Sequence, residues 1–385
     1  MEMRQLKQCS HAAWHALCSS EGVKSVLLFA SMVLLVSCNK KEAPVKPTDD
    51  INGAIDVIPI PADPPPNQIR YRDTQVEQFL VNGVMVPCTS FFADRTQRIS
   101  SFDFFSVEDK GELWPGNIVR GKDLREQGRL SSIGSFPRDP MRYTIQGSQG
   151  STAFTVEKPA LSTFNTAWNA NSRFFWFMPA VYAYQETEIT YSAEQAMVDL
   201  GINLGFLAGG LGARFQTVTG NGMTTMYMLV KNVYFNVSAE FPSHPAGFFA
   251  PEVQVSQLRR VMSADNPPAY VSNVSYGRIA LVRLVSKYSQ REIKTAVELS
   301  LQGLGASLTQ SQKKLISELQ LTVEAAPGPS QTIRSMEELM AYINEGAQFN
   351  HRNGAVPVSY EVRYLSNNAP LMTHAGLTYK IRECL

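Results

Sequence analysis

Residues 266–278 read NPPAYVSNVSYGR, and this stretch decides the fold of the chain. It leads into residues 278–285, whose β-branched side chains predict a core strand. Gly277 has no side chain, so it either lets a neighbouring strand approach closely or marks an irregularity in the strand. For Tyr276 and Arg278 the sequence leaves three roles open: contacts between subunits, the core, or the surface.

The composition is that of a globular protein. The chain has 385 residues, of which 44% are hydrophobic and 18% charged, and the length allows two or three domains. The 35 basic and 34 acidic residues nearly cancel, which excludes the basic surface of a nucleic-acid-binding protein. No apolar run reaches the roughly 18 residues that a membrane-spanning helix needs, so a helical membrane protein is excluded as well.

Strands and helices follow one another without the regular β–α–β order of a parallel sheet. Residues 182–190 and 223–239, like 278–285, are rich in β-branched and aromatic residues and predict strands. Residues 358–382 predict two further strands, joined at Asn367-Asn368.

Two helices can also be placed. One is predicted to open within residues 159–168, and the capping box Ser335-Met336-Glu337-Glu338 predicts another that ends near residue 344. The fold class is therefore α+β around a mainly antiparallel sheet.

The first 38 residues have the pattern of an export signal. Lys24 precedes an apolar stretch, residues 26–36, which Leu35-Val36-Ser37-Cys38 closes. Those last four residues resemble the lipobox of bacterial lipoproteins. We therefore expect residues 1–37 to be a signal peptide and Cys38 to be lipidated after cleavage. An ordinary signal peptide with an incidental cysteine is the alternative.

Residues 38–67 are rich in proline, which fixes φ and has no backbone donor. They predict an extended tether that lifts a domain off a membrane surface. A proline-rich ligand for a recognition module is the alternative.

Two segments have an ambiguous pattern. In residues 196–208 every even position is apolar or small and the odd positions are mostly small or polar, which predicts a strand. The same segment follows Ser192-Ala193-Glu194-Gln195, a capping box that predicts a helix. In residues 292–302, apolar Ile293, Val297, Leu299 and Leu301 alternate with polar residues, yet the Glu, Lys and Ala content also permits a helix.

A β-hairpin that spans a bilayer needs about 9–11 residues per strand, with one face toward lipid and one toward water. Segments 193–220 and 286–324 can each supply two such strands. Amphipathic helices or glycine-weakened strands packed on a core sheet are the alternative. The residues predicted to insert into the membrane are Val198, Leu200, Ile202, Leu204 and Phe206 in the first segment and Val297, Leu299, Leu301, Leu319 and Leu321 in the second.

The stretch 266–278 resembles the thiol-activated, or cholesterol-dependent, cytolysins, which carry an almost identical Pro-Pro, Val-Ser-Asn-Val and Tyr-Gly-Arg string ahead of a core strand. Residues 234–242 are similar to the family's preceding strand, and residues 357–365 to its Pro-Ile-Ser-Tyr strand. Trp114-Pro115-Gly116 lies where the family has Tyr-Pro-Gly. The likeness extends with few gaps from about residue 71 to residue 380.

The resemblance implies a fold of the MACPF/CDC superfamily: a bent, antiparallel four-stranded sheet flanked by helical clusters, with a small elongated β domain. It also implies that both ambiguous segments are helical in the soluble form and refold into paired membrane-inserting hairpins once subunits have assembled. The expected organisation is a signal peptide (1–37), a tether after lipidated Cys38 (38–67), an elongated β region (68–155 and 350–385) and a core (156–349) with hairpin segments 193–220 and 286–324.

The sequence departs from the family in three ways, of which one is the expected lipid anchor and tether, which a diffusible toxin does not need. The family's C-terminal β-sandwich, with its Trp-rich, cysteine-containing undecapeptide, has no counterpart in this sequence. Cholesterol binding is therefore implied by the family resemblance and by no motif of this sequence. The glycine pair that lets the family's sheet bend is replaced by Glu324-Ala325-Ala326-Pro327-Gly328-Pro329. Because proline cannot donate a hydrogen bond in a central strand, we expect the strand to end or bulge there.

The leading functional hypothesis is a cytolysin-like pore-forming lipoprotein that oligomerises and inserts β-hairpins into a target membrane. Its expected partners are the lipid membrane and either further copies of the chain or a homologous subunit. The sequence does not decide whether sterol is a partner. Neither nucleic acid nor a small-molecule substrate is expected. The protein is expected to be exported by a bacterium to the outer membrane or cell surface, or released. The alternative is a non-lytic surface lipoprotein that uses the same scaffold for adhesion or assembly.

An enzyme is the class that the sequence supports least. The five histidines show no HExxH motif and no Cys-His ligand spacing, and no GxGxxG or GK[ST] motif is present. We therefore expect no catalytic residue, no metal ligand and no cofactor. Cys88 is predicted to be a lone thiol rather than a nucleophile.

Overall fold

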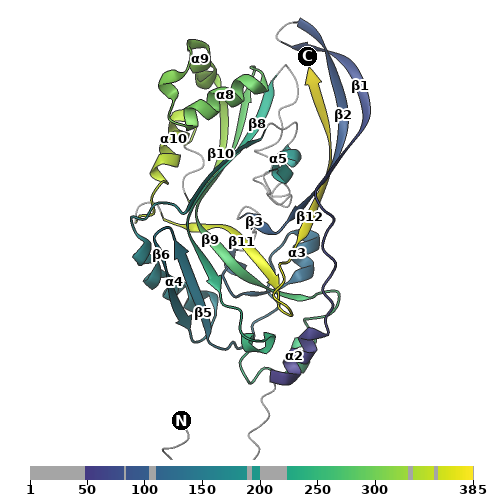
Figure 1. The fold of residues 1–385 in the computed structure, drawn as a ribbon, viewed down its shortest axis with the longest axis vertical. Coiled ribbons are helices and arrows are strands. Elements are labelled where there is room, and N and C mark those ends of the chain that lie inside the picture. Colours follow the sequence, from purple (N-terminus) through teal and green to yellow (C-terminus); the bar gives the residue numbers. More distant parts are fainter. Residues whose placement is uncertain are drawn as a thin grey trace, which may run out of the picture. The chain divides into compact units, whose positions relative to one another are not determined.

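Strand β9, Pro268–Ser286, is the central strand of a large antiparallel sheet in the computed structural model of the chain (Figure 1). The structure describes residues 48–81, 84–103, 110–188, 193–199, 223–327, 333–350 and 354–384, all within one unit, Pro47–Leu385. β9 is 19 residues long and is buried at nearly every position. A strand of this kind is covered on both faces, which explains its nearly continuous run of β-branched and aromatic residues.

The C-terminal half of β9 lies in what we call the upper half of the sheet. Here β8, Thr224–Ala239, pairs with β9 on one side, and β7, Tyr182–Glu188, pairs with β8. On the other side of β9 lies β10, Gln320–Ala326. The order is therefore β7-β8-β9-β10, and the strands predicted at residues 182–190, 223–239 and 278–285 are confirmed.

In the lower half both long strands have different neighbours. β5, Met141–Gly147, replaces β7 beside β8, and β11, Val356–Tyr364, replaces β10 beside β9. β6, Gly150–Val156, and β3, Ser101–Asp103, lie outside them, and β4, Ile118–Arg120, pairs with the start of β9. The sheet is thus larger than the four strands that the resemblance implies, because β8 and β9 continue past the motif and form a second set of pairs.

The neighbours change at Gly277. The pairing register shifts there in both adjacent strands, between Val233 and Phe235 in β8 and between Pro357 and Ser359 in β11. A Cβ atom at position 277 would collide with the carbonyl oxygen of Asn232. The β8 backbone therefore comes so close to β9 that only glycine fits.

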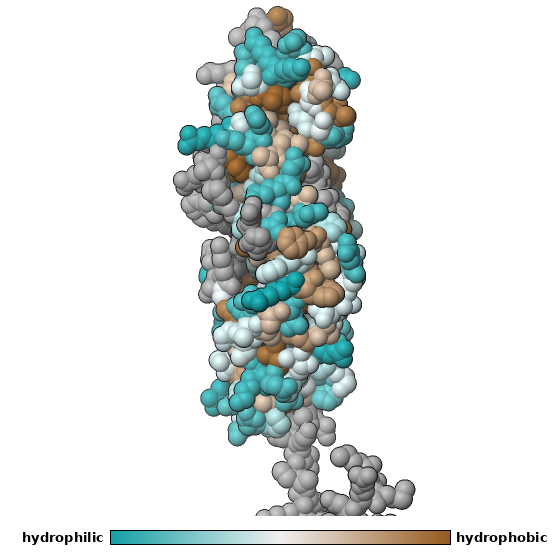
Figure 2. All heavy atoms as spheres, turned by 90° about the vertical axis from the view of Figure 1, so that its left-hand side faces the viewer, coloured by the Kyte–Doolittle hydropathy of each residue, from teal (hydrophilic) through white to brown (hydrophobic). Residues whose placement is uncertain are grey.

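Three helices cover one face of the upper half. They are α8, Gln290–Leu301; α9, Gln310–Glu318; and α10, Met336–Glu345, with the short turn η6, Gly305–Ser307, between α8 and α9. Figure 2 shows the side on which these helices lie: hydrophilic residues cover most of it, and hydrophobic ones form separate patches. The apolar faces of the helices point inward.

Each of these helices begins with a capping box. Ser289, Thr309 and Ser335 each accept a hydrogen bond from the backbone N–H three residues later. The carboxylate of Glu338 in turn accepts from the Ser335 N–H at 3.1 Å. The helix predicted from the Ser335 capping box is confirmed and ends one residue later than expected.

Helix α5, Ala193–Asp199, covers the opposite face of the upper half. Ala196 and Met197 are fully buried in a cluster that also holds Tyr227 of β8 and Ile279 of β9. α5 also contacts β12, Thr373–Cys384, so it lies between the large sheet and a second, smaller sheet (Figure 1).

The lower half is covered by α4, Leu161–Ser172, and the turn η3, Arg173–Phe175. Phe164 and Trp168 pack into the largest apolar cluster, where the ring of Trp168 lies tilted against that of Phe235 with centroids 4.7 Å apart. This confirms the helix predicted to open within residues 159–168.

The second sheet has three strands in the order β1-β2-β12: Gln68–Val81, Val84–Ile99 and Thr373–Cys384. The Thr373 hydroxyl donates to the carbonyl of Arg125 in α3, Gly121–Gln127, which attaches β12 to the rest of the unit. This sheet fills only part of the elongated region predicted for residues 68–155 and 350–385. Strands β3 to β6 and β11 belong to the large sheet because their apolar sides face its core.

The predicted tether is interrupted by a helix. Residues 48–58 contain no proline, and α2, Thr48–Asp56, forms there with Ile51 and Ile55 one turn apart and buried. The Asn52 side-chain oxygen accepts the Ala246 N–H at 2.7 Å, so α2 is fixed beside η5, Pro245–Phe248, and near α7, Val255–Leu258. The expectation of an extended chain throughout residues 38–67 was therefore wrong for these residues. In the described part of the chain the remaining short turn is η2, Lys110–Glu112.

Cys88 is not a lone thiol, because it is disulfide-bonded. It is fully buried in β2, and the residue opposite it in β12 is Cys384. The prediction failed because the pairing depends on the register of two strands from opposite ends of the chain.

The close approach at Gly277 makes a direct prediction. Gly277→Ala should lower the free energy of unfolding by about 3 kcal/mol or more, since the new methyl group meets backbone rather than a movable side chain. Urea unfolding followed by circular dichroism measures this. Gly376→Ala, in strand β12 where a Cβ meets no atom within 4 Å, is the matched control. Equal effects of the two substitutions would contradict the proposed contact.

Candidate membrane-inserting segments and the motif strand

Helix α8 buries residues at helical spacing. Ile293, Ala296 and Val297 are fully buried, and they belong to an apolar cluster with Met228 of β8 and Val282 of β9. Positions i, i+3 and i+4 lie on one face of a helix. Burying each large aliphatic side chain contributes about 1.5–3 kcal/mol, so this contact is the main force that keeps α8 on the sheet.

The helix does not explain every apolar residue of the segment. Leu299 is half-buried and lies outside that cluster, and Leu301 is only partly buried at its edge. In a strand, however, Ile293, Val297, Leu299 and Leu301 would all share one face. The segment therefore carries a helical pattern that the structure uses and a strand pattern that it leaves unused.

The second part of segment 286–324 is already partly strand. Leu315 of α9 and Leu319, which follows the helix in extended conformation, are buried in the same cluster. β10 begins at the next residue, and Leu321 lies opposite Leu284 of β9. Refolding of this part would extend an existing strand rather than create one.

The first segment is described only at its start. Val198 is fully buried, and its neighbours Ala196 and Met197 pack on the sheet. The predicted membrane-inserting residues Leu200, Ile202, Leu204 and Phe206 lie outside the described residues, as does Cys38.

Charged groups join the end of α9 to the end of β9. The Lys287 ammonium lies 3.0 Å from the Glu318 carboxylate, which also accepts from the Tyr288 hydroxyl. The hydrogen bond from Lys287 lowers the pKa of Glu318, and the hydrogen bond to Glu318 raises the pKa of Lys287. The pair is therefore charged from above the pKa of Glu318 to below that of Lys287. Exposed pairs of this kind contribute little, so apolar packing holds the helices in place.

The motif residue Tyr276 belongs to the lower core. Its ring stacks on Trp168, with ring centroids 4.6 Å apart and an interplanar angle of 24°. Burial raises the pKa of Tyr276, so the hydroxyl stays neutral. Within this subunit, its role is core packing.

Arg278 connects the sheet to α10. Its guanidinium lies 3.9 Å from the centroid of the Tyr342 ring and 3.4 Å from a Glu345 carboxylate oxygen. The Arg278 side chain is 6% exposed, whereas that of Glu345 is 59% exposed. A desolvated cation over an aromatic face is the stronger of the two contacts.

Tyr342 was not singled out from the sequence. Its hydroxyl lies within 3.5 Å of the carbonyl oxygens of Ile279, Ala326 and Pro327, so α10 is fixed where β9 and β10 diverge. β10 ends at Ala326, directly before Pro327, as predicted. The helical spacing of Leu339, Tyr342 and Ile343 indicates a buried face, but not that the tyrosine binds Arg278.

The described residues show neither a metal site nor a spanning helix. Among them, no group of three or more His, Cys, Asp or Glu side chains is placed to hold a metal ion. Within the same residues, none of the helices has the length and hydrophobicity needed to cross a membrane.

Comparison with known proteins identifies the class. The sequence profile of the thiol-activated cytolysins matches residues 100–379. Perfringolysin O of Clostridium perfringens is 26% identical over 289 residues, covering 71% of this chain and 57% of the relative. Alveolysin of Paenibacillus alvei is 27% identical over 282 residues, covering 69% and 56%. This chain therefore belongs to the thiol-activated cytolysin family, a family of pore-forming toxins rather than enzymes, and its match covers less than two thirds of the length of these relatives.

Solved structures share the fold. A non-hemolytic pneumolysin from Streptococcus pneumoniae matches with a TM-score of 0.73 over 88% of this chain and 75% of that one, at 19% identity. The human-specific toxin intermedilysin matches with a TM-score of 0.70 over the same shares, also at 19% identity. The mixed α+β fold with its large antiparallel sheet is thus that of the cytolysins.

The contacts of Arg278 predict unequal effects of two substitutions. Arg278→Met should lower the free energy of unfolding by about 1–3 kcal/mol, because Tyr342 loses the cation beneath its ring. Glu345→Gln should change it by less than about 1 kcal/mol, because the carboxylate is mostly in water. Urea unfolding monitored by circular dichroism compares them. A larger loss from Glu345→Gln would show that the ion pair, not the ring, holds Arg278.

Proposed function

We propose that this chain is a pore-forming lipoprotein that oligomerises on a target membrane and inserts β-hairpins made from segments 193–220 and 286–324. One observation supports this most directly: α8 is packed as a helix by Ile293, Ala296 and Val297, while Leu299 fits only the pattern of a strand with one apolar face. A segment whose only state is helical has no need of this second pattern.

Insertion must be collective. A single hairpin in lipid would leave the N–H and C=O groups of both its edges without partners, at several kcal/mol for each group. Hairpins from neighbouring subunits that pair into a closed ring satisfy these groups. Assembly therefore comes before insertion in the proposed mechanism.

The upper half of the sheet offers two edges for that assembly. Within the described residues, β7 pairs only with β8, and β10 pairs only with β9. Unpaired edges are where strands of another chain add. We infer that β7 of one subunit meets β10 of the next, whether the neighbour is a second copy or a homologous partner subunit.

Residues 1–67 support export and anchoring in this proposal. We infer that residues 1–37 are removed, that Cys38 receives a lipid, and that the proline-rich residues around α2 link it to the sheets. The protein would then act from the outer membrane or the cell surface, or after release. The family association with cholesterol makes sterol in the target membrane a variable to be tested.

Dye release from liposomes tests the proposed function. The purified mature chain, alone and with a longer homologue from the same genome, is added to vesicles with and without cholesterol. Release together with detergent-resistant oligomers supports the proposal. Failure of every combination would overturn it and favour a non-lytic scaffold for adhesion or assembly.

Holding α8 on the sheet should block the pore. Ala296 of α8 and Met228 of β8 belong to the same buried cluster, so Ala296→Cys with Met228→Cys places one thiol on each of the two elements to be joined. When the new disulfide has formed, dye release should fall at least about tenfold, because refolding of the segment is prevented. Reduction should restore it. The controls for the native disulfide are each single variant and the unmodified chain, treated with the same reductant. Undiminished release by the oxidised double variant would contradict refolding of α8.

Adjacent residues of α8 distinguish the two faces of the inserted hairpin. Leu299→Lys places a charge on the face expected to contact lipid, at a cost of about 2–4 kcal/mol per strand near the membrane centre, so release should nearly vanish. Ser300→Lys places it on the water face and should retain release. Both positions are half-buried in the helix, so thermal unfolding checks that the two variants fold equally well. Equal release by the two variants would exclude the proposed alternation.

A further inference from the structure

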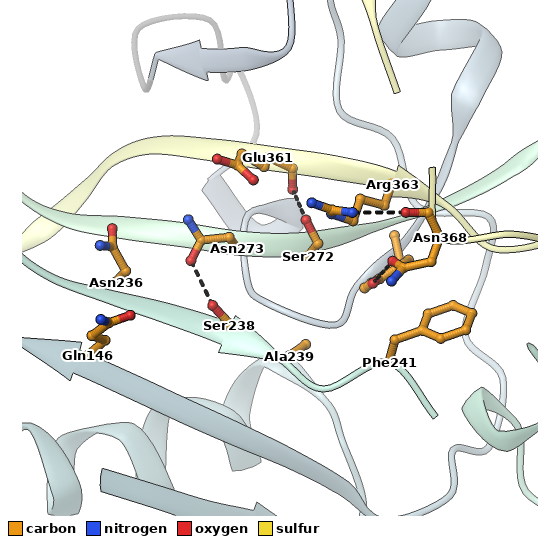
Figure 3. A pocket seen from close by; sticks show the side chains of 11 residues that line it. Gln146, Asn236, Ser238, Ala239, Phe241, Ser272, Asn273, Glu361, Arg363 and Asn368 are labelled. Carbon is orange, nitrogen blue, oxygen red and sulfur yellow. Dashed lines mark hydrogen bonds between the residues drawn. The ribbon is translucent and has the colours of Figure 1, made fainter. Parts of the chain in front are cut away.

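A polar groove lies on the lower half of the sheet (Figure 3), and none of the residues that line it belongs to the helices that the proposed pore uses. Its volume of about 340 Å³ is at the lower end of the range for small-molecule sites. Strands β5, β8, β9 and β11 and the turn after β11 supply its walls. The polar groups that decide its chemistry belong to Gln146, Asn236, Asn273, Glu361, Arg363 and Asn368.

The strand register brings these side chains together. Gln146 of β5 lies opposite Asn236 of β8, and Asn273 of β9 lies opposite Glu361 of β11. Ser238 of β8 lies opposite Asn273 and joins the two pairs. Neighbouring strands are about 4.8 Å apart, so the polar groups form a regular row across four strands.

Hydrogen bonds within the row fix the amides. The Ser275 hydroxyl donates to the side-chain oxygen of Asn236 at 2.7 Å, and the Ser238 hydroxyl donates to that of Asn273 at 3.1 Å. Each amide oxygen is thereby occupied, while its NH₂ group donates to no described residue. The Glu361 carboxylate likewise accepts no hydrogen bond from the described residues, so the row offers fixed donors beside an unoccupied acceptor.

The other end of the groove is closed by aromatic rings. The Tyr270 hydroxyl donates to the side-chain oxygen of Asn368 at 2.6 Å, and Arg363 donates to the Asn368 carbonyl at 2.9 Å. The half-buried ring of Phe241 lies beside Tyr270, with centroids 5.7 Å apart. A ligand in the groove would meet polar groups along the row and an apolar surface at its end.

This arrangement is not what a solvated sheet face requires. Asparagine is disfavoured in strands, yet Asn236 and Asn273 lie within the two longest strands of the large sheet. One carboxylate and one guanidinium give the groove no net charge, which disfavours an anion. A single carboxylate is also too few for a cation site, and no metal-ligand group was found among the described residues.

We propose that this groove binds the pyranose ring of a sugar. Sugar hydroxyls donate to the Glu361 carboxylate and accept from the amides of Asn236 and Asn273 along the row, while an apolar face of a ring at the other end of the groove lies against Phe241. Hydroxyl-rich neutral ligands match such closely spaced donors and acceptors. The proposal is independent of pore formation, because the groove shares no residue with either hairpin segment.

Saturation-transfer NMR with the mature chain tests this binding. The probes are glucose, galactose, mannose and N-acetylglucosamine with the disaccharides lactose, maltose and chitobiose. The same sugars attached to beads separate recognition of a free sugar from recognition of the end of a surface glycan. Asn273→Ala should raise the Kd of any bound probe about five- to tenfold, and Glu361→Gln about tenfold or more, because the second change removes a charge-assisted hydrogen bond.

Controls keep the result interpretable. Thr155→Ala lies on an exposed position of the edge strand β6, outside the groove, and should leave the Kd unchanged. Thermal unfolding shows whether each variant folds, and Asn236→Ala replaces Asn273→Ala if that variant does not. Binding in either format that the groove variants weaken and Thr155→Ala does not supports the proposal. No binding of any probe, or binding that the groove variants leave unchanged, would overturn it.

Discussion

The contact between the backbones of β8 and β9 at Gly277 is the constraint on which the rest of the structure depends. Because no side chain fits there, the two long strands can lie together while their registers shift. The same two strands therefore pair with two different sets of neighbours. These are β7 and β10 in the upper half and β5 and β11 in the lower half. The upper half carries the segments that we propose refold, and the lower half contains the packed rings of Tyr276 and Trp168.

The upper half is held together mainly by apolar packing. Its helices are held mainly by apolar side chains on β8, β9 and β10, and polar contacts such as Lys287 with Glu318 are exposed and weak. Arg278 and Tyr342 hold α10 where β9 and β10 part, one residue beyond the Gly277 contact. The same short stretch of β9 thus sets the path of the sheet and the attachment of a helix.

Local signals in the sequence predicted individual elements well. β-branched runs marked the long strands, and the Ser335 capping box marked α10, because each pattern reflects interactions between residues close in the chain. Features that depend on distant pairing were missed or misjudged. The larger sheet, the partner of Cys88 and the row of amides from Gln146 to Glu361 all depend on strand register, which no local pattern specifies. Helix α2 was missed because the surrounding prolines dominated the composition, although Ile51 and Ile55 had helical spacing.

The disulfide at Cys88 also carries information about where the protein becomes complete. Thiols remain reduced in the bacterial cytosol and pair in oxidising compartments beyond it. A chain that carries this bond in β2 therefore reaches its final covalent state only after it has left the cytosol. Because β2 pairs with β12, and β12 contacts α5, the bond lies in the sheet against which this helix packs, so that sheet is covalently complete only in an oxidising compartment.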